Sequence, residues 1–230
     1  MRLVFVHAAG SSGDEWVQQR LAFSGAYEVA TPDLPGHGRS AEEPLRRIED
    51  MAEWLERTQD IARAVLIGHS MGAAAALGVA ARAISLRGLV LVGAALQPRV
   101  PEGFVERVAL DPTVAVERLA TNGFARGTRM AVVEKASAYL ARTDPNVLAA
   151  DFAATAAFDA TAFVSRVRVP TLVVTGAEDR LTTVADAEAL ARGIRGAELA
   201  VIDGAGHMVM LERPREFDER LERFFRGLSG

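Results

Sequence analysis

The feature that most restricts the fold of this chain is a short turn between a buried strand and a helix. The turn reads Gly68-His69-Ser70-Met71-Gly72. An apolar run precedes it and an alanine-rich stretch follows it, which is typical of a strand that turns sharply into a helix. A serine at such a turn has a strained backbone, and its neighbours two residues away must be small because strand and helix approach closely. The turn therefore predicts a serine hydroxyl that stands clear of a sheet, beside the N-H groups of a helix start.

Six short runs rich in β-branched residues recur along the chain. They cover residues 3–7, 27–33, 64–69, 89–93, 171–176 and 198–203. Near-continuous apolar runs are typical of parallel strands that are buried on both faces. Helical patterns lie between them, and those at 44–58 and 214–228 each open with a proline at a favoured first helical position. This alternation predicts an α/β fold, with an open, mostly parallel sheet of about six strands and helices on both faces.

One interval is longer than this alternation needs. About 75 residues separate the fourth run from the fifth, whereas a crossover requires one helix. Asp111-Pro112 and Asp144-Pro145 each pair a capping residue with a first-turn proline, and residues 128–142 have a helical period. We therefore expect a small cap of three or four helices inserted after the fourth strand. The expected division is a core at 1–94 and 166–230 and a cap at 95–165.

Composition excludes several classes of function. Lys and Arg number 26 against 30 Asp and Glu, so the net charge of −4 argues against a nucleic-acid partner. The chain has no cysteine, which excludes disulfides, thiolate metal sites and a cysteine nucleophile. The first apolar run is too short for a signal peptide, so we expect a cytoplasmic protein. The 18 residues 64–81 lack charge, but their polar, glycine-rich middle favours a buried strand, turn and helix over a membrane span.

A serine hydroxyl becomes a strong nucleophile only beside a base, which in turn needs an orienting acid. Glu178 and Asp179 follow the fifth strand run, and His207 follows the sixth in a glycine-rich loop. The carboxyl ends of parallel strands gather the sites of open α/β sheets, so these groups are expected to meet Ser70. We favour Asp179 over Glu178 from its position in the turn. The alternatives are that Asp179 only caps a helix beginning near Thr182, and that His207 is a packing or surface histidine.

The other three histidines are expected to have structural roles. His69 adjoins the serine but should point away from it in an extended strand, as a buried, hydrogen-bonded packing residue. His37 lies in a proline- and glycine-rich loop, where a structural role is expected. His7 ends the first strand run and is expected to hold the following loop in place rather than to transfer protons. That loop could lend a backbone N-H to an oxyanion, with the N-H of Met71 as its partner.

Five segments together resemble the α/β-hydrolase family. They are His7–Gly10, Asp33–Ser40, Gly68–Gly72, Val169–Asp179 and Gly204–His207, and they span nearly the whole chain. The resemblance implies Ser70 as nucleophile, Asp179 as acid and His207 as base. It also implies the N-H groups of Ala9 and Met71 as oxyanion hole, and a helical lid. The chain looks most like the small serine carboxylesterases with a lid, and we expect no cofactor and no metal.

The chain departs from the family pattern in two ways. Family members usually have two further strands before the first one here, so six strands are expected and the sheet edge is less protected. Ala8 stands where the family usually has glycine, and its β-carbon could narrow the acyl side of the site. Substrate size is therefore open.

The resulting hypothesis is two-step acyl transfer on a small or medium carboxylic ester, thioester or lactone. The partner is then a small-molecule ester, without nucleic acid or membrane, and the protein a monomer or homodimer. Cofactor-free perhydrolysis and C-C bond cleavage on the same triad stay open, as does a slow-turnover ligand receptor. The cap has seven basic and eight acidic residues, so no excess charge selects a substrate. Its six aromatic residues could line an apolar pocket or only pack the cap onto the core.

Overall fold

Six parallel strands form the centre of the molecule, in a computed structural model that describes residues 1–82 and 85–228. The strand order in the sheet is β2-β1-β3-β4-β5-β6. The strands are β1 (Arg2–Val6), β2 (Glu28–Ala30), β3 (Val65–His69), β4 (Gly88–Val92), β5 (Thr171–Gly176) and β6 (Glu198–Ile202). All neighbouring pairs are parallel. The predicted fold class and number of strands are confirmed.

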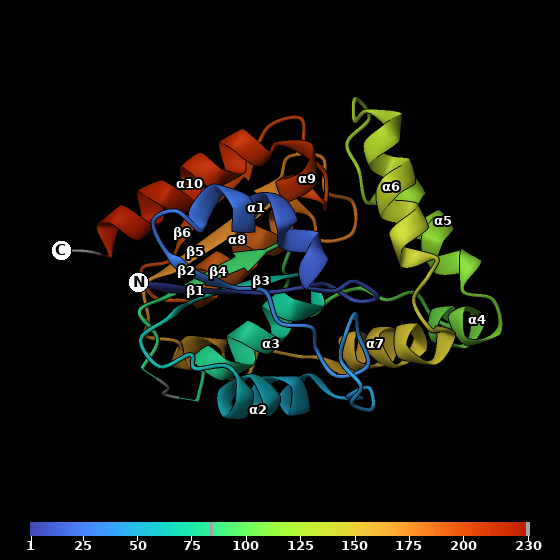
Figure 1. The fold of residues 1–230 in the computed structure, drawn as a ribbon, viewed down its shortest axis with the longest axis horizontal. Helices are drawn as coiled ribbons and strands as arrows, with labels where there is room; N and C mark the ends of the chain where they lie inside the picture. The colour runs from blue at the N-terminus through green and yellow to red at the C-terminus, as the bar shows by residue number, and fades with distance from the viewer. Residues whose placement is uncertain (83–84, 229–230) are drawn as a thin grey trace.

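Helices cover both faces of the sheet (Figure 1). One face carries η1 (Gly13–Trp16), α1 (Val17–Phe23), α9 (Val209–Glu212) and α10 (Pro214–Gly227). The other carries α2 (Ile48–Thr58), α3 (Met71–Ala80), η2 (Val164–Arg166) and α8 (Val184–Gly193). Side chains of β3 alternate between the two layers, so Leu66 packs with α2 and α3 whereas Ile67 packs with α1 and α10. Burial on both faces explains why these strands read as continuous apolar runs.

The predicted start of the second helix is wrong. The pattern at residues 44–58 and the proline at its front suggested that the helix begins at Pro44, but α2 begins at Ile48. Pro44 instead packs against Gly36, whose φ of +84° makes a tight turn in the preceding loop. Residues 44–47 therefore belong to the loop that joins β2 to α2. In α10, by contrast, Pro214 does occupy the first turn.

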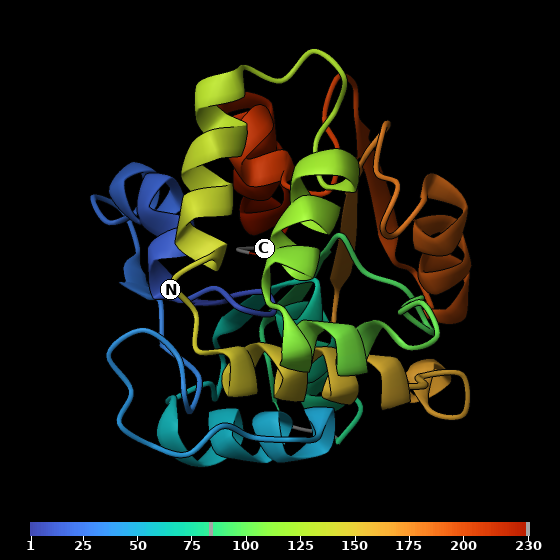
Figure 2. The ribbon, with the colours of Figure 1, turned by 90° about the vertical axis from the view of Figure 1, so that its right-hand side faces the viewer.

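Four further helices lie between β4 and β5, and we call them the inserted helices. They are α4 (Phe104–Leu110), α5 (Thr113–Asn122), α6 (Met130–Leu140) and α7 (Pro145–Ala157). Figure 1 shows them gathered at one end of the sheet, and Figure 2 shows α5 and α6 side by side above α7. Asp144 caps α7 by accepting from the N-H of Asn146, as its pairing with Pro145 predicted. The rings of Phe104 and Phe152 pack edge to face, with their centroids 4.9 Å apart, and connect α4 to α7.

The charge-free stretch at residues 64–81 forms β3, the turn at Ser70 and α3, as expected. Every residue of β3 is buried, and α3 is buried along nearly its whole length. In the described part of the chain, no helix combines the length and the apolarity that crossing a membrane requires. The cytoplasmic location stays a prediction.

Candidate active site

The turn between β3 and α3 holds Ser70 in a strained backbone conformation. Its φ of +52° and ψ of −114° lie where residues other than glycine are rarely found. The N-H of Ser70 donates to the carbonyl oxygen of Val92 at 2.9 Å, which fixes the turn to β4. A β-carbon at Gly68 would meet the Gly72 carbonyl, and one at Gly72 would lie 2.5 Å from the carbonyl oxygens of Val6 and His7. Backbone contact on both sides is why the turn requires small residues.

Replacing Gly72 by alanine tests this close approach. The new methyl group meets backbone rather than a movable side chain, so we expect the free energy of unfolding to fall by about 3 kcal/mol or more. Urea unfolding measures the loss. The matched control is Gly127→Ala, because a β-carbon there meets nothing within 4 Å and the change should stay within about 1 kcal/mol of zero. Equal stability of both variants would contradict the backbone contact.

Asp179 and His207 form a buried hydrogen-bonded pair at the ends of β5 and β6. His207 Nδ1 lies 2.9 Å from Asp179 Oδ2, and the Thr182 hydroxyl donates to the same oxygen at 2.8 Å. Asp179 Oδ1 accepts from the N-H groups of Leu181 and Thr182. The four donors require an ionised carboxylate and direct the Nδ1 hydrogen of His207 toward it. The alternative that Asp179 caps the next helix is wrong, because Thr183 and Asp186 form the capping box of α8.

The environment shifts the pKa of both members of this pair. Burial alone would raise the pKa of the Asp179 carboxyl, but the neighbouring His207 and the hydrogen bonds hold it below its ordinary value. Burial would lower the pKa of the His207 imidazole, but the Asp179 carboxylate and its hydrogen bond raise it above the ordinary value. Glu15 and Glu212 raise it further. Glu178, the other candidate acid, instead accepts from the backbone N-H of Arg126.

Ser70 and His207 are brought to the same place by β4. Ser70 bonds to the carbonyl of Val92, and the ring of His207 lies so close to Gly93 that a β-carbon there would be 2.9 Å from His207 Cε1. Both residues line one cavity. In the described part of the chain, Ser70 Oγ and His207 are not hydrogen-bonded to each other. Catalytic hydrogen bonds are often long without substrate and tighten in the reacting complex.

Within the described ranges, the N-H groups of Ala8 and Gly10, in the loop after β1, are bound, whereas that of Ala9 between them is not. The N-H of Ala8 donates to Glu15 Oε2 at 3.3 Å, and that of Gly10 donates to Asp151 Oδ2 at 2.7 Å. Between them, the N-H of Ala9 has no hydrogen-bond partner among the described residues, and neither has that of Met71 at the start of α3. Both residues predicted for an oxyanion hole thus have an uncommitted donor.

His7 holds this loop, in agreement with the structural role expected of it. Its Nε2 accepts from the N-H of Leu34 at 3.1 Å, so its hydrogen is on Nδ1 and donates to the carbonyl of Ala8 at 2.8 Å. Burial and the neighbouring His37 lower the pKa of His7, which favours this neutral form. His7 therefore anchors Ala8 and is committed at both ring nitrogens.

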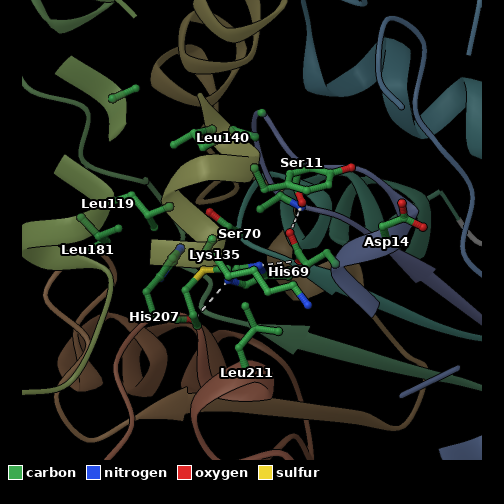
Figure 3. Close-up of a pocket in the computed structure, with 18 of the residues that line it drawn as sticks. Ser11, Asp14, His69, Ser70, Leu119, Lys135, Leu140, Leu181, His207 and Leu211 are labelled. Carbon is green, nitrogen blue, oxygen red and sulfur yellow. Dashed lines mark hydrogen bonds and ion pairs between the residues drawn. The ribbon is translucent and has the colours of Figure 1, made fainter. Parts of the chain in front are cut away.

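His69 is buried and hydrogen-bonded, as expected, but it does not point away from the site. Its Nδ1 lies 2.8 Å from Glu15 Oε1 and its Nε2 lies 3.1 Å from the backbone oxygen of His207. The rings of His69 and His207 have centroids 4.8 Å apart, and His69 lines the cavity (Figure 3). Burial opposes charge on Glu15, but His69 keeps the pKa of its carboxyl below the ordinary value. His69 thus connects Glu15 to the loop that carries His207.

His37 pairs with a carboxylate of the inserted helices. Its Nδ1 lies 3.0 Å from the carbonyl of Pro35, and its Nε2 lies 2.8 Å from Asp151 Oδ2. Because both ring nitrogens face acceptors, His37 must donate from both and carry a positive charge. Burial would lower the pKa of His37, but the hydrogen bond and charge of Asp151 raise it above the ordinary value. The expected structural role is therefore an ion pair between the core and α7.

A cavity of about 630 Å³ lies between the carboxyl end of the sheet and the inserted helices. Figure 3 shows Ser70, His69 and His207 grouped within it. Most other side chains around them are apolar, among them Leu119, Leu140, Phe152, Leu181, Met208 and Leu211. No cluster of three or more His, Asp or Glu side chains within the described ranges could hold a metal ion. Phe152 and Tyr139 of the predicted cap aromatics line the cavity, whereas Phe158 and Phe163 pack against each other.

Three functional neighbours were not predicted: Glu15, Asp151 and Thr182. Glu15 lies in the short helix η1 and Thr182 in the loop before α8, and nothing in either local sequence marks a buried side chain. The sequence could have indicated Asp151, because it is the lone charged residue among the 13 residues of α7. A charge in an otherwise apolar helix that is buried must find a partner.

Comparison with known proteins identifies the family of this chain. Residues 3–220 match the model of the alpha/beta hydrolase family. A 3-oxoadipate enol-lactonase of Acinetobacter baylyi is 30% identical over 234 residues, covering 96% of this chain and 86% of the relative. A pimeloyl-[acyl-carrier protein] methyl ester esterase of Aromatoleum aromaticum is 29% identical over 98% of both chains. The solved structure of a thermophilic esterase from Thermogutta terrifontis superimposes with a TM-score of 0.90 at 26% identity, over 99% of this chain and 90% of that one.

These matches confirm the expectation of an enzyme of the hydrolase class, and the relatives' names agree with ester bonds as its target. The family match covers almost the whole chain, including the strand-turn-helix at Ser70 and the loops that carry Asp179 and His207. The chain belongs to the alpha/beta hydrolase family.

Proposed function

We propose that the protein is a serine esterase that hydrolyses small or medium carboxylic esters through an acyl-enzyme on Ser70. His207 is the general base, Asp179 orients it, and the N-H groups of Ala9 and Met71 form the oxyanion hole. Residues 95–165 act as the cap over a core made of 1–94 and 166–230. The observation that carries the proposal is the buried Asp179–His207 pair, which lies in one site with a serine on a strained turn.

The hydrogen bonds of Asp179 support this division of roles. Because its carboxylate accepts a hydrogen bond from Nδ1-H of His207, the lone pair of Nε2 is free to accept the Ser70 proton. Ser70 Oγ then attacks the ester carbonyl, and the proton passes to the leaving alcohol as the acyl-enzyme forms. Water, deprotonated by the same Nε2, attacks the acyl carbonyl; the bond from Ser70 Oγ to the acyl carbon then breaks, the acid leaves, and the imidazolium returns its proton to Ser70 Oγ. The imidazolium that forms twice in this cycle is stabilised by the Asp179 carboxylate.

The free N-H groups of Ala9 and Met71 support electrostatic stabilisation of the negative oxygen in both tetrahedral intermediates. Each is next to a residue that the surroundings hold firmly, since Ala8 and Gly10 are bound to carboxylates and Ser70 is bound to Val92. Fixed donors cost no reorganisation when the charge develops. Removing one such donor typically raises the barrier by about 2.7 to 4 kcal/mol.

The cavity supports a substrate of modest size. Its volume of about 630 Å³ lies within the common range for small-molecule sites, and its wall is mainly apolar beyond the reacting groups. Such a wall favours an acyl chain over a polar headgroup. Lactones are a second candidate class, because the relatives include an enol-lactonase at 30% identity. A lactone is a cyclic ester and would open by the same attack on its carbonyl.

A fluorophosphonate probe followed by an ester panel tests the proposal. We expect covalent labelling at Ser70, located by mass spectrometry, because the probe phosphonylates an activated serine. The panel consists of p-nitrophenyl esters of rising acyl length, together with five- and six-membered lactones. We expect kcat/KM to rise with chain length until the cavity is full and then to fall. Labelling at another residue, or no turnover of any ester or lactone, would contradict the proposal.

A further inference from the structure

We infer that Asp151, a residue of the inserted helix α7, positions the oxyanion loop at residues 8–10. This inference rests on the proposed function, since it gives the loop its role in acyl transfer. Asp151 Oδ2 accepts the N-H of Gly10 at 2.7 Å and lies 2.8 Å from Nε2 of His37. The carboxylate thus binds the loop from the cap side and is itself held by a charged histidine of the core. Asp151 is a positioning residue, because it acts on the loop and not on the substrate.

Two carboxylates from outside the oxyanion loop each accept a hydrogen bond from one of its backbone N-H groups. Glu15 holds the N-H of Ala8 and Asp151 holds that of Gly10, so the residue between them keeps its N-H free. If either flanking N-H were released, the peptide planes around Ala9 could rotate and turn its N-H away from the developing oxyanion. A displacement of about 1 Å at a reacting centre can cost about 100-fold in rate.

Other contacts from the inserted helices meet the same loop. The Thr143 hydroxyl, just after α6, donates to the carbonyl of Gly10 at 2.6 Å. The Tyr139 and Ser12 hydroxyls are hydrogen-bonded to each other. Gly10, at a φ of +64°, leaves no room for a β-carbon because the side chains of Leu140 and Leu148 lie against it. The N-H of Gly10 is therefore bound by Asp151 of α7, and its carbonyl is bound by Thr143, which lies between α6 and α7.

Stability alone does not account for a carboxylate at this position. Asp151 is completely buried, and its Oδ1 has no hydrogen-bond partner among the described residues. A buried ion pair is often no more stable than well-packed apolar side chains of the same volume, and an unpaired buried oxygen adds a further cost. Apolar side chains in place of both Asp151 and His37 would dock α7 on the core at least as well. Such a pair could not bind the N-H of Gly10, which Asp151 Oδ2 accepts at 2.7 Å.

Two variants separate positioning from packing. Asp151→Asn keeps the shape but replaces the bonds of Gly10 and His37 to a charged oxygen by weaker bonds to a neutral amide oxygen, and we expect kcat for a p-nitrophenyl ester to fall about 10- to 100-fold. KM should change less than about threefold, because the hole acts on the transition state and not on the bound ester. Thr143→Val removes only the bond to the Gly10 carbonyl, and we expect a smaller loss of kcat, about three- to tenfold. Should Asp151→Asn fail to fold, Thr143→Val still tests whether contacts from the inserted helices position the oxyanion loop.

The decisive readout is a transition-state analogue. In an alkyl trifluoromethyl ketone, Ser70 Oγ adds to the carbonyl carbon, its proton passes to His207, and the carbonyl oxygen becomes an oxyanion in the hole. For Asp151→Asn we expect Ki of this inhibitor to rise by the same factor by which kcat/KM falls. The matched control is Thr155→Val, which removes a buried hydroxyl without a hydrogen-bond partner from the same helix. It should leave kcat, KM and Ki within about twofold of wild type.

The outcomes distinguish this inference from the proposed function. A wild-type protein that is neither labelled by fluorophosphonate nor active on esters contradicts the proposed function. Even then, faster amide hydrogen exchange at residues 8–11 in Asp151→Asn would support the inference that Asp151 positions the loop. An active wild type with unchanged kcat and Ki in both variants overturns the inference and leaves the esterase intact. So does a loss of thermal stability in Asp151→Asn without any change in Ki.

Discussion

Replacing Ser70 by alanine is expected to lower kcat for a short p-nitrophenyl ester by about 10⁵-fold or more. Without the hydroxyl no acyl-enzyme forms, and His207 and the oxyanion donors can assist only a direct attack by water. Groups that act as one unit lose nearly their whole effect when the nucleophile is removed. The measurement is the steady-state rate at saturating ester, and the variant must be free of wild-type contamination.

The fold should survive this change. Alanine has the same β-carbon as serine, so the strain at φ +52° is unchanged, and the Ser70 side chain makes no hydrogen bond within the described part of the chain. A matched control is Ser137→Ala on α6, where the lost hydroxyl is buried and, like that of Ser70, has no hydrogen-bond partner among the described residues, and activity should stay within about twofold. Wild-type turnover by Ser70→Ala would show that another residue is the nucleophile.

Glycine at the same position gives a second readout. Ser70→Gly should be as inactive as Ser70→Ala, but it relieves a conformation that costs about 1 to 3 kcal/mol for residues with a β-carbon. After the entropy that glycine loses on folding, we expect a gain of about 1 kcal/mol in the free energy of unfolding relative to Ser70→Ala. Such a gain would mean that the strain at the turn is retained for activity.

The parts of the fold that could be predicted are those set by local pattern. Continuous apolar runs mark strands buried on both faces, and β3 and β4 are buried at every residue. The positions of Asp179 and His207 follow from the same pattern, because each comes directly after a strand and parallel strands end at one edge. Sequence therefore sufficed to bring these two residues together, and the structure pairs them at 2.9 Å.

The parts that could not be predicted depend on partners far along the chain. Glu15 meets His69 across 54 residues, and Asp151 meets His37 across 114. Periodicity reports which face of an element is buried, but not which distant side chain it meets there. For this reason the strand pattern predicts that His69 points away from the site, although its ring lies against that of His207. The wrong prediction for the start of α2 has a more local cause, because Pro44 packs against Gly36 within the loop that precedes the helix.

Asp179→Asn is the second change with a large expected effect. The Oδ1 position of Asp179 accepts two backbone N-H groups, so the asparagine oxygen is required there and its NH₂ takes the place of Oδ2. That NH₂ group then donates toward Nδ1 of His207, which has to accept. The hydrogen of the neutral ring moves to Nε2, where it blocks acceptance of the Ser70 proton. We expect kcat to fall by about 10⁴-fold with little change in KM.

The control for this variant is Glu178→Gln at the neighbouring position. Its side chain accepts one backbone N-H from Arg126 and, within the described ranges, makes no hydrogen bond or ion pair with His207, so kcat should stay within about threefold of wild type. The pair of variants decides which of the two adjacent acids orients the base. A large loss in Glu178→Gln with a small one in Asp179→Asn would reverse the assignment.

The pH dependence of Asp179→Asn gives an independent check through the pKa of His207. The base works only when it is neutral, so activity is lost as pH falls through its pKa. Asp179 is the main group that raises this pKa above the ordinary 6.5, against the effect of burial, so the acid limb of wild-type kcat/KM should lie above pH 6.5. Without the carboxylate, burial is less opposed, and the acid limb of the residual activity should move to lower pH. An acid limb that stays in place would mean that Asp179 does not face the titrating group, and the loss of rate would then need another cause than the tautomer of His207.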